Sequence, residues 1–172
     1  MKLHSALTIN GKPYPAGTDV PWYTIYPFFL LHMLMFGGSG FLMAYAADDV
    51  PVGFLYLHGG IAILVYVVFY FALFGRDEVR WMFINAGLGL LGIRAEIGWL
   101  LGWFGKEIGD YPWVVHVVPF LYYILYTFLL RQLVLDLAGV RDDPARKARV
   151  EWLYVALSLA IYLVLLATAP RA

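Results

Sequence analysis

Five long apolar segments alternate with short polar ones along the chain. The apolar segments span residues 23–46, 52–75, 79–104, 112–135 and 150–169. Each is close to or longer than the roughly 20 residues that a helix needs to cross a hydrocarbon core of about 30 Å. Backbone groups inside lipid must be paired within the segment, which favours helices. The pattern therefore predicts a bundle of five transmembrane helices.

The connections between these segments carry charges together with Gly or Pro, as connecting turns do. Lys and Arg are enriched in the cytoplasmic loops of membrane proteins. With a cytoplasmic N-terminus, Lys106 and Arg171 lie outside, and the cytoplasmic set is Lys2, Lys12, Arg76, Arg80, Arg141, Arg146, Lys147 and Arg149. If residues 79–104 formed a re-entrant loop instead of a full span, the basic residues at 141–149 would lie on the side opposite the other basic residues. The excess of Lys and Arg on one side would then nearly vanish. We therefore expect five full spans, with the N-terminus inside and the C-terminus outside.

Residues 1–22 precede the first span and show a different pattern. The stretch LTINGKPY places Asn10 and Gly11 between two short runs that favour strands, the usual signal for a two-residue hairpin turn. The first twenty residues lack the apolar stretch of a secretory signal, so we expect them to be retained. The chain then divides into a cytoplasmic N-terminal hairpin segment, 1–22, and a helical membrane domain, 23–172. The hairpin either docks a partner or simply leads the chain to the membrane.

Composition narrows the class of protein further. Hydrophobic residues make up 62% of the 172 residues and charged residues only 14%, and the mean hydropathy is +0.73. This is too little polar surface for a water-soluble domain, so we expect an all-α integral membrane protein in contact with lipid, in a bacterial inner membrane. A net charge of zero gives no basic footprint for nucleic acid. The absence of cysteine excludes disulfides, thiolate metal sites and CxxC redox pairs.

The third apolar segment contains two charged residues well inside its ends, Arg94 and Glu96, within GLGLLGIRAEIGWLLGW. Ionisable side chains inside spans cost about 2.5–3.5 kcal/mol each and normally face the bundle interior, a partner or a water cavity. Two residues apart on a helix, these side chains diverge by about 200° and cannot pair with each other. Glu96 shares a face with Asn85 and the glycines, whereas Arg94 needs a different partner. Structural ion pairs and a functional site both remain open.

Three histidines lie in the predicted spans, and their depth follows from the rise of about 1.5 Å per residue. His58, Glu96 and His116 are expected at one level, in the outer third of the membrane, while His32 lies nearer the middle. Two imidazoles and a carboxylate at one depth suit a metal site or a proton relay. One concrete version is a b-type haem held by His58 and His116, with Arg94 near a propionate.

Further polar and small residues extend this picture. His116 begins a helix face that continues through Tyr123 and Thr127, whose hydroxyls would carry a polar path inward. The GxGxxG match at Gly87 lies inside a span rather than after a strand, so we reject it as a nucleotide site. The glycines there, the GGSG stretch at 37–40 and the Gly98/Gly102 pair are better explained by close helix packing. These small-residue faces predict a protein partner or a second copy of the chain.

Familiar enzyme signatures are missing from the chain, which has no GxSxG, HExxH, P-loop or HxxxH motif. The sequence therefore predicts no reaction. Our first hypothesis is a small subunit of a larger membrane system with an outer-leaflet polar site that handles protons, a metal or haem, or a lipid headgroup. One alternative is a non-catalytic assembly subunit that packs through its glycine faces. Another is a small transporter for an apolar or amphipathic molecule.

Overall fold

The computed structural model describes residues 1–9, 11–47 and 50–168, and it is 77% helical. Five of its helical segments are long and apolar enough to cross a membrane. They are α1 (Trp22–Tyr45), α2 (Val52–Phe74), a composite third segment (Arg76–Trp103), α6 (Trp113–Leu137) and α7 (Pro144–Thr168). The five predicted helices are therefore confirmed, with most boundaries shifted by three residues or fewer. The predicted end of the last span, at residue 169, lies outside the described residues.

The third segment is built from four pieces. A short helix, α3 (Arg76–Val79), turns at Arg80 into α4 (Trp81–Gly92), and a π-helical turn, η1 (Ile93–Ile97), joins α4 to α5 (Gly98–Trp103). The π-helical turn contains Arg94 and Glu96, the two charged residues of α4, η1 and α5. Single π-helical turns inside α-helices are rare and occur frequently at functional sites.

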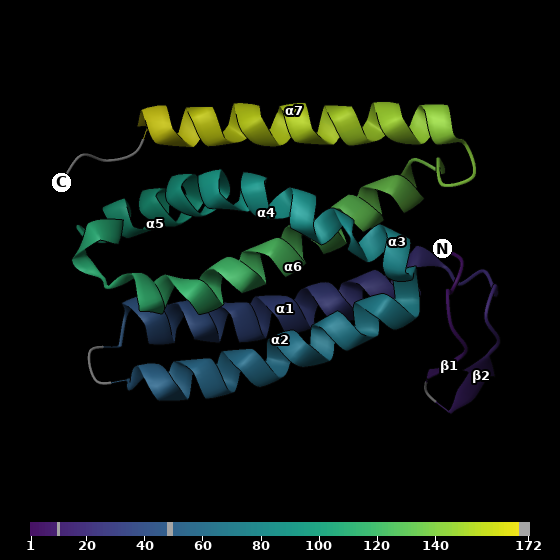
Figure 1. Ribbon diagram of the computed structural model, residues 1–172, viewed down its shortest axis with the longest axis horizontal. Coiled ribbons are helices and arrows are strands. Elements are labelled where there is room, and N and C mark those ends of the chain that lie inside the picture. The colour runs from purple at the N-terminus through teal and green to yellow at the C-terminus, as the bar shows by residue number, and fades with distance from the viewer. Residues whose placement is uncertain (10, 48–49, 169–172) are drawn as a thin grey trace.

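Helix α6 is the centre of the bundle, because it contacts α1, α2, α4 and α7. It crosses between the α1/α2 pair and the α4/α5 segment, and α7 lies along the outer edge of the bundle (Figure 1). The closest packing between α2 and α6 is at Gly59, where an added Cβ would lie 2.3 Å from Val118 Cγ1. Aromatic side chains fill the core at the other end of these helices, with Tyr70 and Phe128 fully buried between them.

Helix α7 differs from its prediction at its beginning, which lies at Pro144 rather than near residue 150. Asp143 caps the helix, because its carboxylate accepts hydrogen bonds from the amides of Ala145 (3.1 Å) and Arg146 (3.0 Å). Hydropathy marked only the apolar part of the helix and left out its charged first turns. Tyr162 is the one buried residue among the residues of α7.

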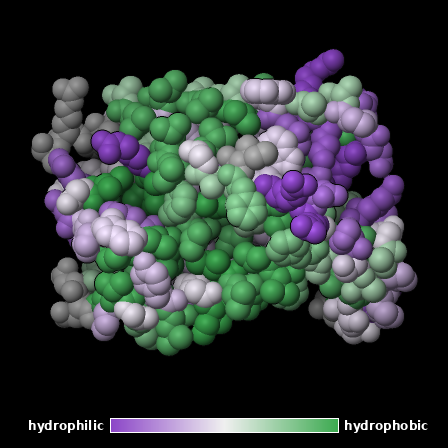
Figure 2. All heavy atoms as spheres, viewed as in Figure 1, coloured by the Kyte–Doolittle hydropathy of each residue, from purple (hydrophilic) through white to green (hydrophobic). Residues whose placement is uncertain are grey.

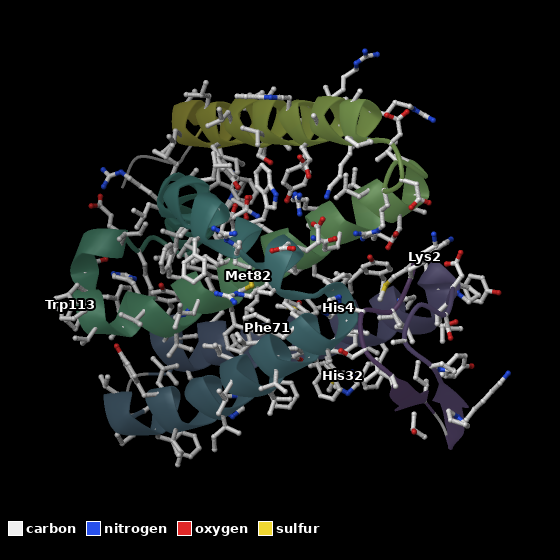
Figure 3. All side chains as sticks on the ribbon, turned by 45° about the vertical axis from the view of Figure 1, so that its right-hand side comes forward. Lys2, His4, His32, Phe71, Met82 and Trp113 are labelled. Carbon is white, nitrogen blue, oxygen red and sulfur yellow. The ribbon has the colours of Figure 1, made fainter. Side chains whose placement is uncertain are left out.

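The predicted hairpin is confirmed by an antiparallel pair of strands, β1 (Leu7–Ile9) and β2 (Lys12–Tyr14), in which Ile9 pairs with Lys12. The segment before β1 caps α2: the amide of His4 donates to the carbonyl of Leu73 (3.1 Å) and that of Ser5 to Ala72 (3.0 Å). Figure 3 shows His4 at this end of the bundle and Trp113 at the opposite end. The hairpin thus closes one end of the helices.

The surface of the molecule is largely apolar around its middle. In Figure 2 hydrophobic residues cover the centre of the visible face, and hydrophilic residues gather at the end that carries the hairpin and the α6–α7 connection. Large side chains such as Phe83 (81% exposed) and Trp152 (74%) lie on this surface. An apolar surface of this extent is unusual for a soluble monomer and is compatible with a multi-pass membrane protein.

Candidate functional site

Glu96 lies where three helical segments meet. Its carboxylate accepts a hydrogen bond from the Tyr123 hydroxyl of α6 at 3.2 Å. The same Tyr123 hydroxyl is hydrogen-bonded to the Tyr162 hydroxyl of α7. A carboxylate and two phenols, each from a different segment, therefore form one short hydrogen-bonded chain.

Glycines on the Glu96 side of α4 make room for this chain. A Cβ added at Gly92 would lie 2.2 Å from the Tyr123 hydroxyl oxygen, and one at Gly89 would lie 3.3 Å from both Phe120 and Ile124. These glycines share a face with Glu96, as helical geometry predicts. The space beside them is filled by the side chains of Tyr123, Phe120 and Ile124 of α6. Asn85 on the same helix is 3% exposed, and its Nδ2 has no hydrogen-bond partner among the described residues.

Polar side chains continue from Glu96 along the contact between α6 and α7. Tyr123, Thr127 and Arg131 are spaced four residues apart on α6, and the Thr127 hydroxyl donates to the Tyr123 carbonyl at 2.9 Å. On α7, the Tyr154 hydroxyl donates to the Thr127 carbonyl at 2.9 Å. We call this row the α6–α7 seam, formed by Glu96, Tyr123, Tyr162, Thr127, Tyr154, Arg131 and Glu151.

The seam ends in a buried ionic cluster near the α6–α7 connection. Arg131 is 2% exposed and contacts two carboxylates, those of Glu78 (3.1 Å) and Glu151. Its guanidinium also lies 4.4 Å from the ring centre of Trp81. Lys147 forms an ion pair with Glu78. The negative charges of Glu78 and Glu151 balance the positive charges of Arg131 and Lys147, so these groups can stay ionised although they are largely shielded from water.

A second polar group joins α1 to the α6–α7 connection. The Tyr26 hydroxyl donates to the Asp136 carboxylate, which also pairs with Arg141. Burial opposes the charged form of Arg141, but the hydrogen bonds and negative charge of Asp136 outweigh this and raise the pKa of Arg141. These contacts fix the connection against the bundle, and they were not anticipated from the sequence.

The structure does not bring the three predicted metal ligands together. No group of three or more His, Cys, Asp or Glu side chains within the described ranges could hold a metal ion. Glu96 bonds to Tyr123, His58 lies 3.0 Å from Ser39, and His116 lies 2.8 Å from Tyr45. The expected metal site at His58, Glu96 and His116 is corrected accordingly. The prediction rested on depth along the helices, and depth does not give the direction of a side chain around the bundle.

The haem version of the site meets a similar difficulty. His116 Nε2 lies 3.2 Å from the carbonyl of Ile108, which can only accept, so His116 Nδ1 accepts from the Tyr45 hydroxyl. Both ring nitrogens of His116 are therefore engaged within the chain. His58 instead lines an open apolar groove of about 400 Å³ between α1 and α2, together with His32. The predicted haem ligands thus lie in separate surroundings.

Arg94 is exposed, unlike Glu96, which is partly buried. Within the described part of the chain, Arg94 forms neither an ion pair nor a side-chain hydrogen bond. The divergence of the two side chains predicted from helical geometry is therefore seen. The partner that Arg94 was predicted to need is not found among residues 1–9, 11–47 and 50–168.

Comparison of the chain with models of protein families, with curated proteins and with solved structures finds no match.

The contribution of α7 to the site was not predicted from the sequence. Tyr162, Tyr154, Glu151 and the buried Arg131 of α6 were not selected. The signal was present, because Lys147, Glu151, Tyr154, Ser158 and Tyr162 are spaced by three or four residues and so share one helix face. Only the pairing of α6 with α7 shows that this face meets Tyr123.

Proposed function

We propose that this chain is a multi-pass subunit of a larger protein system in a bacterial cytoplasmic membrane. We propose further that Glu96, Tyr123 and Tyr162 take up protons and pass them along the helix bundle. The observation that carries the proposal is the hydrogen-bonded chain of one carboxylate and two phenols on three helical segments. An ionised carboxylate inside a membrane span is costly, so exchange of a proton is the chemistry to which such a group is suited.

The proposed orientation has the N-terminus in the cytoplasm. The hairpin, α3 and the α6–α7 connection lie at one end of the bundle, and most basic residues outside the spans belong to these segments (Figure 1). Lys106 belongs to the α5–α6 connection at the other end. This distribution agrees with the enrichment of Lys and Arg on the cytoplasmic side. The ionic cluster is then cytoplasmic, and Glu96 lies in the outer half of the membrane.

The proton transfer needs no redox partner. The Tyr123 hydroxyl gives its proton to the Glu96 carboxylate while its oxygen accepts the proton of the Tyr162 hydroxyl. This first step moves two protons together, between oxygen atoms that are already hydrogen-bonded. Tyr162 then takes back a proton from water at the far end of the α6–α7 seam, passed on through Ser158, which lies one helical turn from both Tyr154 and Tyr162. Release of the proton from Glu96 to water at the outer surface completes the cycle.

Infrared difference spectroscopy of the reconstituted protein during a pH titration tests this proposal. We expect a carbonyl-stretch band from a protonated carboxyl group that disappears in Glu96→Gln and shifts in Tyr123→Phe, because the second change removes only the hydroxyl. Tyr126→Phe is the matched control, since Tyr126 is on the same helix and 40% exposed. A titrating band that persists in Glu96→Gln, or no titrating band in the unmodified protein, would overturn the proton role.

The role of an assembly subunit is a second candidate, and Arg94 favours it. An exposed arginine within an apolar segment is better explained by a neighbouring protein than by lipid. Glu96→Gln also separates the two candidates in cells. Lost proton transfer with intact protein complexes favours the proton role. Weakened recovery of the protein complexes with unchanged proton transfer favours the assembly role. The metal and haem versions are not carried further, because the structure separates their ligands.

A further inference from the structure

Arg94 lies deep within the proposed membrane span. It is nine residues before Trp103 and thirteen after Trp81, which places it about 14 Å from the end of α5 and about 20 Å from the beginning of α4. Helical side chains lean towards the helix N-terminus, and for Arg94 this is the more distant end. The guanidinium is therefore poorly placed to reach the nearer membrane surface.

The described residues offer no acidic partner for Arg94 at this depth. Glu96 is the one carboxylate of the same helical turn, and it is partly buried against α6, on the side where Tyr123 binds it. The other acidic side chains among the described residues belong to connections or to the two outermost turns of helices. A second copy of the chain would bring only its own Glu96 to the level of Arg94, bound to Tyr123 in the same way. Its partner must have a different sequence.

The surface around Arg94 has the spacing of a helix-packing face. Phe83, Gly87, Leu90 and Arg94 follow each other at intervals of four, three and four residues, and all four are exposed. Intervals of this kind form the contact line between two helices that cross at a small left-handed angle. A Cβ added at Gly87 would have nothing within 4 Å, so a neighbouring helix can approach the backbone there. We call these four residues the Arg94 face.

We propose that the Arg94 face binds a transmembrane helix of another protein, with an aspartate or glutamate of that helix opposite Arg94. Charge complementarity identifies the partner: a carboxylate would neutralise the exposed guanidinium, and the Gly87 position would receive a side chain of the same helix. The inference rests on the membrane placement proposed above, but not on the proton role of Glu96.

The test uses the full chain in phosphatidylcholine vesicles and a synthetic helix of leucine and alanine with one central aspartate. Energy transfer between labels on the protein and the peptide measures binding. We expect the aspartate peptide to bind about tenfold more tightly than an otherwise identical asparagine peptide, as a single strong contact between membrane helices allows. Arg94→Gln should abolish this preference, and Arg94→Lys should retain part of it.

Two further variants keep the test specific. Gly87→Leu leaves Arg94 in place but blocks the close approach, so it should weaken binding of the aspartate peptide. Arg76→Gln, which removes an exposed arginine at the end of the segment, should have no effect. Arg94→Gln should leave the infrared band of Glu96 unchanged, so a failed proton role and a failed interface give different results.

Two outcomes would overturn the inference. One is equal binding of the aspartate and asparagine peptides to the unmodified protein. The other is contact of Arg94 with an anionic lipid instead of a protein. In that case spin-labelled phosphatidylglycerol would bind preferentially to the unmodified protein but not to Arg94→Gln. The aspartate peptide would bind equally to the unmodified protein and to Arg94→Gln.

Discussion

Single glycines decide how closely the helices of this bundle approach each other. Gly92 faces the hydroxyl of Tyr123, so the backbone of α4 comes close to the phenol that binds Glu96. Gly87, five residues earlier on the same helix, faces open space. The two positions have the same residue and the same secondary structure but different surroundings, which makes them a matched pair.

Gly92→Ala should lower the free energy of unfolding by about 1–3 kcal/mol, because the new methyl group overlaps the Tyr123 hydroxyl and forces the ring to move. Gly87→Ala should be neutral or stabilising by up to about 1 kcal/mol, because alanine favours helix and the space is empty. Denaturation in detergent, followed by tryptophan fluorescence, measures both. Equal stability of the two variants would show that Tyr123 does not pack on Gly92.

Helix α7 contacts α4, η1, α5 and α6, and its polar contacts lie in its first turns and at Tyr154 and Tyr162. Most of its apolar side chains face outward, while Glu151 and Lys147 reach into the ionic cluster around Arg131. The contact of α7 with the rest of the bundle is therefore more polar than the contacts between α1, α2 and α6. This makes α7 sensitive to the charge balance of the cluster.

Arg131→Met should destabilise the protein by roughly 3–5 kcal/mol, because it leaves the carboxylates of Glu78 and Glu151 close together without the guanidinium between them. Neutralising both with Glu78→Gln and Glu151→Gln in the same chain should recover most of that loss. The free energy of unfolding and protease cleavage of the α6–α7 connection both report the effect. A fully stable Arg131→Met protein would contradict the role assigned to the cluster.

The elements that sequence could predict are those in which one local property decides the structure. Hydropathy marks the five helices, and Asn10-Gly11 with its flanking strands marks the hairpin. The divergence of Arg94 and Glu96 follows from helical geometry alone. The beginning of α7 at Pro144 was missed because its first turns are charged and hydropathy detects only the apolar part.

The candidate site was predicted only in part, for a physical reason. Glu96 was chosen because an ionisable side chain inside a span is unusual, and Tyr123 because it lies on the helix face that begins at His116. Their partner Tyr162 was not, because a tyrosine in an aromatic-rich chain has no distinguishing local feature. Its role depends on how α7 is rotated against α6. The same lack of information on rotation led to the incorrect grouping of His58 and His116 around Glu96.

At the scale of the whole molecule, charge is distributed unevenly between the two ends of the bundle. The hairpin, α3, the α6–α7 connection and the ionic cluster lie together at one end, opposite the η2 turn (Ile108–Asp110) (Figure 1). This asymmetry underlies the orientation proposed for the chain. It also makes the orientation testable with few substitutions.

The chain has no cysteine, so single cysteines can be labelled without background. Gly109→Cys, in the exposed η2 turn, should react in intact cells with a maleimide that cannot cross the membrane. Gly11→Cys, in the hairpin, should react only after the membrane is permeabilised. Reaction of Gly11→Cys but not Gly109→Cys in intact cells would reverse the orientation. Reaction of both in intact cells would place both positions outside, and this would rule out the three spans proposed between them.

The π-helical turn η1 has a consequence for the two halves of the third span. An extra residue in a helix rotates everything after it by about 100° relative to everything before it. Glu96 and the glycines of α4 can therefore face α6, while the buried Leu101 of α5 keeps its own apolar surroundings. In a regular α-helix the direction of Glu96 would fix the direction of Leu101, because successive residues are rotated by a constant angle. The turn separates them, so the polar site and the packing of α5 can change independently of each other.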